Sequence, residues 1–141
     1  MNMQYEFDVM NMRDYGEALA LWEATENVRI SPADERDNVA AYLAKSPEQS
    51  FVCRCGGELV GTVLCANDGR RAYIHHLAVK PQHRRQGIAH KLVDLALMAQ
   101  EGYGIGKCHI LVFTDNDTGI AFWESEGFDK RDDIYIMSKN V

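Results

Sequence analysis

The residues best suited to chemistry lie in one loop, between a strand that ends at Val79 and a helix that begins near Gly87. A helix start leaves several backbone N–H groups without partners and carries partial positive charge. Gly87 and Ala89 have almost no side chain, so an anion can approach that backbone closely. Arg84 and Arg85 add forked donors that suit phosphate oxygens. These residue types predict a pyrophosphate site, with a solvated basic cluster that caps a helix as the equal alternative.

The other chemistry-bearing residue types suggest no metal site. Cys53 and Cys55 flank a single residue, whereas a structural zinc site needs wider C-x₂₋₄-C spacing and a second ligand pair. The four cysteines are therefore expected to be reduced and to pack as small hydrophobes. The acids Asp34, Glu35 and Asp37 crowd the expected start of a helix, where its dipole favours anions, and are interpreted as a solvated helix start.

Periodicity of the apolar residues indicates the elements that must position the loop. Ser31 and Pro32 form a helix start, as N-cap and first helical residue. Strands are expected at 5–9, 50–54, 58–66, 72–79, 107–113 and 134–138, and helices at 14–24, 31–45, 87–100 and 118–126. The order β-α-α-β-β-β-α-β-α-β predicts an α/β domain around a mixed, mostly antiparallel sheet, and not a doubly wound nucleotide fold.

Length and charge limit the classes of protein that remain. The chain of 141 residues is expected to form a single domain over 1–141. A formal charge of −6 disfavours nucleic acid and anionic membranes as partners and weakly favours a cationic one. No apolar run approaches the roughly 20 residues that span a bilayer, and no signal peptide is visible, so a cytoplasmic location is expected.

Two motifs give the sequence a family resemblance. The segment Arg84-Arg85-Gln86-Gly87-Ile88-Ala89 resembles the R/Q-x-x-G-x-G/A motif of the GNAT family of N-acetyltransferases, and the family's usual L-A-V-x-P strand end precedes it. Asn116 together with residues 121–128 (AFWESEGF) is similar to a second family signature, N-x-x-A-x-x-(Y)-E-x-x-G-F. Because the two motifs occur in the right order and spacing, they favour the pyrophosphate interpretation of the loop. Within the family, the chain most resembles small bacterial members of unassigned substrate.

The resemblance implies acetyl-CoA as the cosubstrate. No metal is expected. It implies that Leu77, Ala78 and Val79 offer backbone groups to the pantetheine, on a strand that splays from the 107–113 strand. Asn116 would lie near the pantetheine or thioester end. The phosphate-binding residues that it implies are Arg84, Arg85, Gln86, Gly87, Ile88, Ala89 and His90.

The resemblance also directs attention to proton transfer, since an ammonium cannot attack a thioester. Histidine is the default base near neutral pH. Strand alternation places Tyr73 and His75 on one face, which in several family members faces the substrate, and His76 on the other, against a helix. His75 is therefore the expected base with Tyr73 assisting, and a structural hydrogen-bonded histidine is the equal alternative.

The family's usual thiolate-protonating tyrosine is replaced by Trp123, whose indole N–H is not usefully acidic. Tyr135 is the remaining candidate for a proton donor. The expected function is acetyl transfer from acetyl-CoA to a primary amine of a small molecule, by direct attack in a ternary complex. The alternatives are a non-catalytic acyl-CoA-binding module and a protein lysine or N-terminal acetyltransferase. The acceptor amine and a homodimer are left open.

Overall fold

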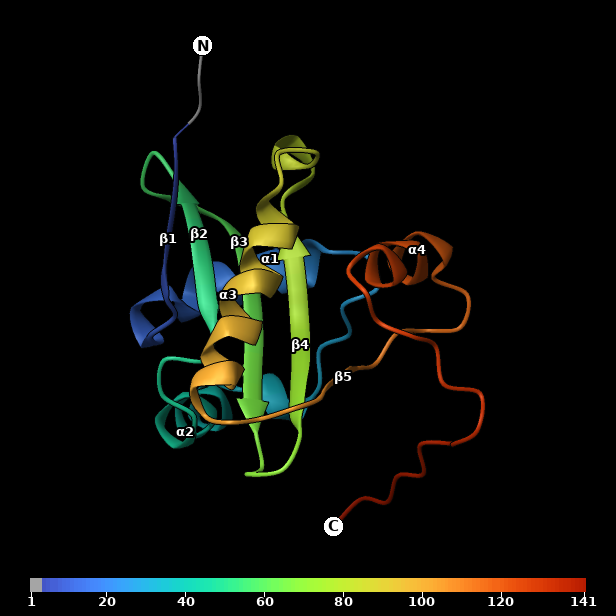
Figure 1. The fold of residues 1–141 in the computed structure, drawn as a ribbon. Coiled ribbons are helices and arrows are strands. Elements are labelled where there is room, and N and C mark those ends of the chain that lie inside the picture. The colour runs from blue at the N-terminus through green and yellow to red at the C-terminus, as the bar shows by residue number, and fades with distance from the viewer. Residues whose placement is uncertain (1–3) are drawn as a thin grey trace. The chain divides into compact units, whose positions relative to one another are not determined.

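The computed structural model describes residues 4–141 (Figure 1). The chain forms two compact units, one that ends at Leu111 and one that runs from Val112 to Val141. Within the described range, no helix has the length and apolar character that crossing a membrane requires.

The first unit is built on a five-stranded sheet whose strands lie in the same order as in the chain. Four strands pair antiparallel and the last pair is parallel, so the expected mixed, mostly antiparallel sheet is confirmed. The strands are β1 (Tyr5–Val9), β2 (Phe51–Cys55), β3 (Glu58–Asn67), β4 (Ala72–Val79) and β5 (Cys108–Ile110). β3 is central and is buried from Leu59 to Cys65.

Helices cover both faces of this sheet. α3 (Ile88–Gly102) lies over one face, and α1 (Tyr15–Ala24) and α2 (Arg36–Lys45) lie over the other (Figure 1). The core on the α1 and α2 side contains Trp22, Val39 and Leu64. On the opposite side, a Cβ on Gly61 would lie 3.1 Å from Ile88 Cγ2, so the missing side chain lets α3 approach β3 closely.

The expected continuous helix over 31–45 is wrong in its first turn. Ser31 caps a separate 3₁₀ turn, η2 (Pro32–Asp34), and α2 begins only at Arg36. The backbone of Glu35 is extended, with φ −64° and ψ 152°, which separates the two. The expectation that Asp34 is solvated is also wrong, because this residue is 6% exposed. Its carboxylate turns back to accept the Ser31 N–H and therefore faces the protein.

The second unit contains one helix, α4 (Asp117–Ser125), and no strand in any of its residues, all of which are described. The strand expected over 134–138 is therefore wrong for this structure. Tyr135 is 95% exposed and Met137 92% exposed. An alternating pattern becomes a strand only when another strand offers it backbone hydrogen bonds, and this unit offers none. The strand expected over 107–113 is likewise reduced to the three residues of β5.

The four cysteines are all free in the structure. Cys53 and Cys65 are fully buried in the sheet. Burial raises the pKa of the Cys53 thiol to about 11, so this side chain is neutral near pH 7.

Candidate functional site

The free edge of β4 is the first component of the site. β5 pairs with β4 only from Ala72 to Ile74, and no other strand of the described chain takes over beyond that point. On the opposite side Lys80 N–H donates to the Val60 carbonyl at 2.8 Å. Because the backbone groups of successive strand residues point to opposite edges, those of Ala78 face β3 and those of Val79 face the free edge. Val79 can therefore exchange hydrogen bonds with an extended ligand that contains amide groups.

A β-bulge at His76 lies within this free edge. The register shifts between the pairs Thr62–Ala78 and Leu64–His75, so that two residues of β4 oppose one residue of β3. His76 itself has a left-handed backbone, with φ 48°. The bulge interrupts the alternation of faces, and the expectation that His76 faces away from His75 is wrong. His75 shares the face of Leu64, on the α1 and α2 side, and the His76 ring also packs on that side, 4.8 Å from the Trp22 ring.

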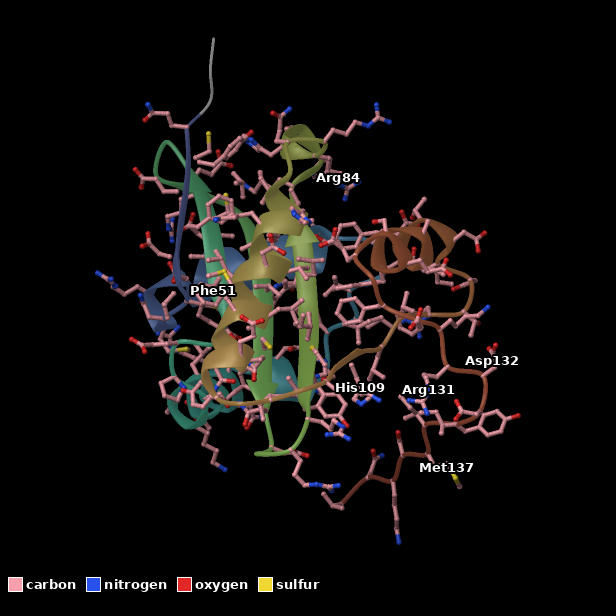
Figure 2. All side chains as sticks on the ribbon, in the orientation of Figure 1. Phe51, Arg84, His109, Arg131, Asp132 and Met137 are labelled. Carbon is pink, nitrogen blue, oxygen red and sulfur yellow. The ribbon has the colours of Figure 1, made fainter. Side chains whose placement is uncertain are left out.

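The turn between β4 and α3 is the second component. It contains the short η3 (Pro81–His83), which Lys80 and His83 connect to the sheet. Lys80 forms an ion pair with Glu58, and the Tyr5 hydroxyl lies 3.0 Å from His83 Nδ1. The Arg84 side chain extends from this turn (Figure 2), and its Nε donates to the Val79 carbonyl at 3.4 Å. The turn is thus fixed to the strand whose edge is open.

The backbone before α3 has the geometry of an anion site. Arg85 and Gly87 both have left-handed backbones, with φ 63° and 79°. The helical hydrogen bonds begin with Lys91 N–H to the Gly87 carbonyl, so the N–H groups of Ile88 and Ala89 have no partner within the helix. A Cβ on Gly87 would meet no heavy atom within 4 Å. Left-handed residues beside a helix start turn consecutive N–H groups toward one point, where an anion is favoured.

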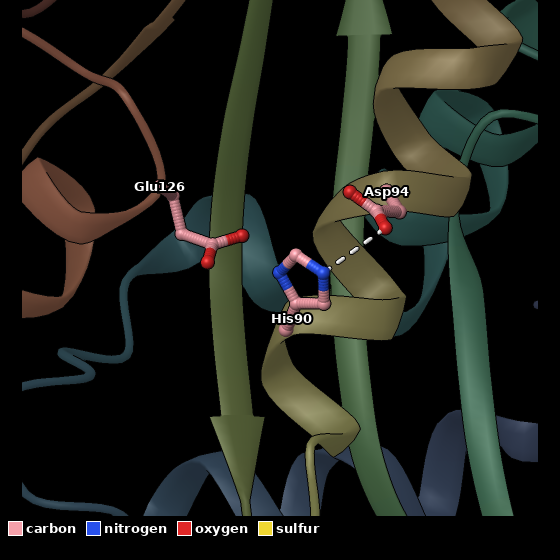
Figure 3. Close-up of side chains that lie close together, drawn as sticks. All are labelled: His90, Asp94 and Glu126. Atoms are coloured by element: carbon pink, nitrogen blue, oxygen red, sulfur yellow. Dashed lines mark ion pairs between the residues drawn. The ribbon is translucent and has the colours of Figure 1, made fainter.

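His90 is the last residue of the expected phosphate-binding set. Its Nε2 lies 3.3 Å from Asp94 Oδ2, one turn further along α3 (Figure 3). Arg85 and Gln86 are exposed at the tip of the loop. The sequence-predicted residues of the turn therefore lie together on one short stretch, next to the free edge of β4.

Tyr73 and His75 lie on one face of β4, as alternation predicts, because they pair with Ala66 and Leu64. Tyr73 is 38% exposed and its ring lies 5.4 Å from that of His109. His75 is exposed as a residue, but its imidazole is partly desolvated by the atoms around it. This desolvation lowers the pKa of His75 below its ordinary 6.5, the neighbouring His76 lowers the pKa further, and Asp34 opposes both. A neutral imidazole at pH 7 is what a base requires.

Asp34 also belongs to this region, although its residue type and position did not predict it. Asp34 Oδ1 lies 2.7 Å from His76 Nε2, and the two side chains are 7% and 18% exposed. A signal for this existed in the sequence. Ser31 and Asp34 have the spacing of a capping box, in which the acid turns back toward the cap. A carboxylate held in that way has a second oxygen left for another donor.

Two expected site residues belong to the second unit. Asn116 is the N-cap of α4, and its Oδ1 accepts the Gly119 N–H at 3.0 Å. Tyr135 lies on the C-terminal segment without regular structure and is exposed to solvent. The structure thus gives Asn116 a local structural role and gives Tyr135 no hydrogen-bond partner among the described residues.

Known proteins similar to this chain match it over nearly their whole length. The model of a family described as "Acetyltransferase (GNAT) family" matches residues 16–128. An acetyltransferase of Yersinia enterocolitica is 30% identical over 136 residues, which are 96% of both chains. An acetyltransferase of Sodalis glossinidius is 28% identical over 96% of this chain and 95% of that protein.

Solved structures with the same fold include coenzyme complexes. The PaiA N-acetyltransferase of Thermoplasma acidophilum, in complex with coenzyme A, superposes with a TM-score of 0.79 at 18% identity and covers 92% of both chains. The aminoglycoside N-acetyltransferase AAC(6')-Iy, in complex with CoA, gives a TM-score of 0.76 at 14% identity, over 100% of this chain and 98% of that one. At such identities the likeness is one of fold.

Proposed function

The chain belongs to the GNAT family of acetyltransferases and depends on acetyl-CoA, and we propose that it acetylates a primary amine of a small molecule. The amine attacks the thioester directly while both substrates are bound. The observation that carries this proposal is the free edge of β4 next to an anion-binding helix start. An amide-containing arm and a pyrophosphate are the two parts of CoA that these features suit. The family match spans both compact units, which supports one acetyltransferase domain over 1–141.

The cosubstrate would contact backbone more than side chains. The backbone groups of Val79 that face the free edge support a pantetheine that runs along β4, with Leu77 beside it. Ala78 contributes a buried side chain beneath. Asn116 is proposed near the thioester end, in addition to its role as a helix cap. The pyrophosphate would be held by the turn and the helix start, that is by Arg84, Arg85, Gln86, Gly87, Ile88, Ala89 and His90.

The chemistry requires one group that removes a proton from the amine. His75 is proposed as this base, assisted by Tyr73 on the same face, because its lowered pKa keeps the ring neutral near pH 7. Tyr135 remains a candidate donor to the CoA thiolate on its residue type alone.

A cationic acceptor is the class that the charge of the chain favours. The formal charge of −6 attracts polyamines and amino sugars in preference to anions. Two solved structures of the same fold are an aminoglycoside acetyltransferase bound to a bisubstrate analogue and another in complex with sisomicin. These names describe those proteins, and the acceptor proposed for this chain rests on charge.

Two assays test the proposal. Thermal shift with CoA measures binding, and thiol release with acetyl-CoA measures transfer over a panel that contains spermidine, kanamycin, lysine and two peptides. We expect CoA to raise the melting temperature and one of the small amines to give turnover. CoA binding without thiol release for any amine would identify a binding module. Release with the peptides alone would identify a protein acetyltransferase.

A further inference from the structure

The Asp34–His76 pair has the arrangement of a carboxylate that orients a catalytic imidazole. His76 Nε2 lies 2.7 Å from Asp34 Oδ1, and both side chains are largely buried. The other carboxylate oxygen, Oδ2, accepts the Ser31 N–H at 3.0 Å. The Tyr15 hydroxyl donates to the Asp34 carbonyl at 2.7 Å, which fixes the backbone of the same residue. Asp34 is therefore held on three sides, and its Oδ1 is directed at the imidazole.

His76 is held from its backbone as well. The Trp22 indole N–H donates to Thr62 Oγ1 at 2.9 Å, and that hydroxyl donates to the His76 carbonyl at 2.9 Å. Trp22 and Thr62 are both fully buried. This series of hydrogen bonds holds the backbone of His76 at a left-handed φ of 48°, a conformation that is strained for a residue other than glycine. Strain of this kind persists where the surroundings over-determine a residue, and functional sites are where it collects.

The second ring nitrogen of His76 is not fully buried and has no hydrogen-bond partner among residues 4–141. Tyr42 Oη is the one fully buried side-chain nitrogen or oxygen without a partner among residues 4–141. His76 Nδ1 has no hydrogen-bond partner among the same residues and does not belong to that fully buried class. The imidazole thus has one nitrogen held by a carboxylate and one nitrogen that is not fully buried, at a residue of β4 beyond the stretch that pairs with β5.

We propose that His76, oriented by Asp34, carries the proton that the leaving CoA thiolate takes up. This inference rests on the proposed function, which places the pantetheine along the adjacent residues of β4. His76 is the catalytic residue and Asp34 is a positioning residue.

The proton balance of the reaction defines the step. His75 first takes one proton from the ammonium and releases it to solvent. The neutral amine then attacks the carbonyl carbon, a C–N bond forms, and the nitrogen carries two protons and a positive charge. His76 Nδ1 accepts one of these protons, the C–S bond breaks with its electron pair on sulfur, and the imidazolium passes the proton to the thiolate. The Asp34 carboxylate stabilises the imidazolium, and His76 ends the cycle neutral.

The structure predicts what Asp34→Asn does to this pair. The Ser31 N–H requires an oxygen from residue 34, so the amide oxygen of asparagine takes the place of Oδ2. Its NH₂ group then faces His76 Nε2, which becomes the acceptor. The ring proton moves to Nδ1, and that nitrogen can no longer accept a proton from the amine. The substitution changes the tautomer while keeping both hydrogen bonds.

The experiment combines the tautomer with kinetics. Imidazole ¹⁵N shifts of histidine-labelled protein report the tautomer of His76, and thiol release with the best panel amine gives kcat. In Asp34→Asn we expect an Nδ1–H tautomer, kcat lower by roughly 10²-fold and CoA affinity within twofold of the wild type. Ser31→Ala is the matched control, because it removes the bond from Ala33 N–H to Ser31 Oγ in the same turn and leaves the carboxylate in place. It should keep kcat.

Each other outcome overturns the proposal. Unchanged kcat in Asp34→Asn with the altered tautomer would remove His76 from the proton path, and an equal loss in Ser31→Ala would reduce the pair to a structural tether. His76→Gln replaces Asp34→Asn if the latter fails to fold, with the same expected loss. A larger loss in Tyr135→Phe than in His76→Gln would assign the proton to Tyr135. If Asp34→Asn and His76→Gln both release thiol with unchanged kcat, this step alone is overturned. If the protein binds CoA and releases no thiol with any amine, the proposed function is overturned as well.

Discussion

Two adjacent histidines on β4 differ in what surrounds each ring. His76 is held by Asp34 and Trp22, whereas His75 projects from the same face without a hydrogen-bond partner among the described residues. Partial desolvation and the His76 ring lower the pKa of His75. A lowered pKa means that the neutral, proton-accepting form persists to more acidic pH.

The pH profile of the reaction should report this. We expect kcat/KM to rise with pH through an ionisation below 6.5, and His75→Gln to lower kcat/KM by roughly 10²-fold with CoA affinity unchanged. His109→Gln, which removes another histidine from a neighbouring strand, is the control and should retain the profile. Stopped-time thiol-release assays from pH 5 to 8 measure both variants. An unaltered acidic limb in His75→Gln would show that the base is another group.

Gly87 combines a left-handed backbone with open space in front of it, as an approaching pyrophosphate requires. Gly87→Glu should weaken CoA binding at least tenfold, about 1.4 kcal/mol, because a carboxylate would occupy the anion site. Gly104→Glu is a matched control, since Gly104 has φ 76° and equally open surroundings. Both variants carry the same backbone strain, so only Gly87→Glu should lose affinity in calorimetric titrations. Equal affinities would place the pyrophosphate elsewhere.

At the scale of elements, α4 depends on one polar contact at its start. Asn116 Oδ1 accepts the Gly119 N–H, and a Cβ on residue 119 would lie 2.3 Å from Asn116 Nδ2. The cap and the glycine are therefore required together.

In a double-mutant cycle, the effect of Gly119→Ala on the free energy of unfolding should change sign when Asn116 is replaced. Asn116→Ala removes the cap and should cost about 1 kcal/mol of unfolding free energy. Gly119→Ala should destabilise the wild type, because the new methyl group displaces the cap. The same substitution should stabilise the Asn116→Ala background, by up to about 1 kcal/mol, since alanine is the better helix former. Denaturant unfolding followed by far-UV circular dichroism measures the four proteins. Additive effects would contradict the close contact.

The elements that sequence periodicity predicts best are those with local causes. β1 and β4 run over the expected residues, because their alternation meets a partner on an adjacent strand. Where the 31–45 helix is interrupted, Asp34 bonds to His76, 42 residues away. At the bulge, the His76 carbonyl accepts a hydrogen bond from Thr62, which in turn accepts one from Trp22. Such contacts join distant parts of the chain and leave no periodic trace. The anion site in the loop from Arg84 to Ala89 could be predicted because it depends on the types of the residues in the loop itself.

At the scale of the molecule, Arg54 connects the start of α1 to the sheet. Its guanidinium contacts Asp14 Oδ1 at 2.7 Å and Glu17 Oε1 at 3.0 Å, and it also donates to the Gly57 carbonyl. Glu17 Oε2 accepts the Leu59 N–H at 3.1 Å. Asp14 is 6% exposed, and its carboxylate accepts hydrogen bonds from Arg54 and from the Asn11 N–H.

Arg54→Met should destabilise the protein by about 2 kcal/mol in urea unfolding, because it leaves a buried carboxylate unpaired. Arg70→Met, on an exposed turn, removes the same charge and should change stability by less than about 0.5 kcal/mol. The Leu59 N–H, and then Arg54, hold the pKa of Glu17 below its usual 4.5. The stabilisation of the folded protein that this lowered pKa provides is present above pH 4.5, and it is lost as the pH falls through the lowered pKa of Glu17. A wild-type-like stability of Arg54→Met would show that water already solvates Asp14.

The short parallel ladder at the edge of the sheet also determines how fast its amide protons exchange with solvent. β5 has three paired residues, whereas β3 lies between two strands and is buried along most of its length. Amides of β5 can therefore exchange through local opening, while those of β3 wait for unfolding of the whole unit. A ligand bound along the free edge of β4 would stabilise the strand to which β5 pairs, so local opening of β5 should become rarer. Deuterium uptake at residues 108–110 should accordingly slow when CoA is added, at concentrations that leave uptake in β3 unchanged.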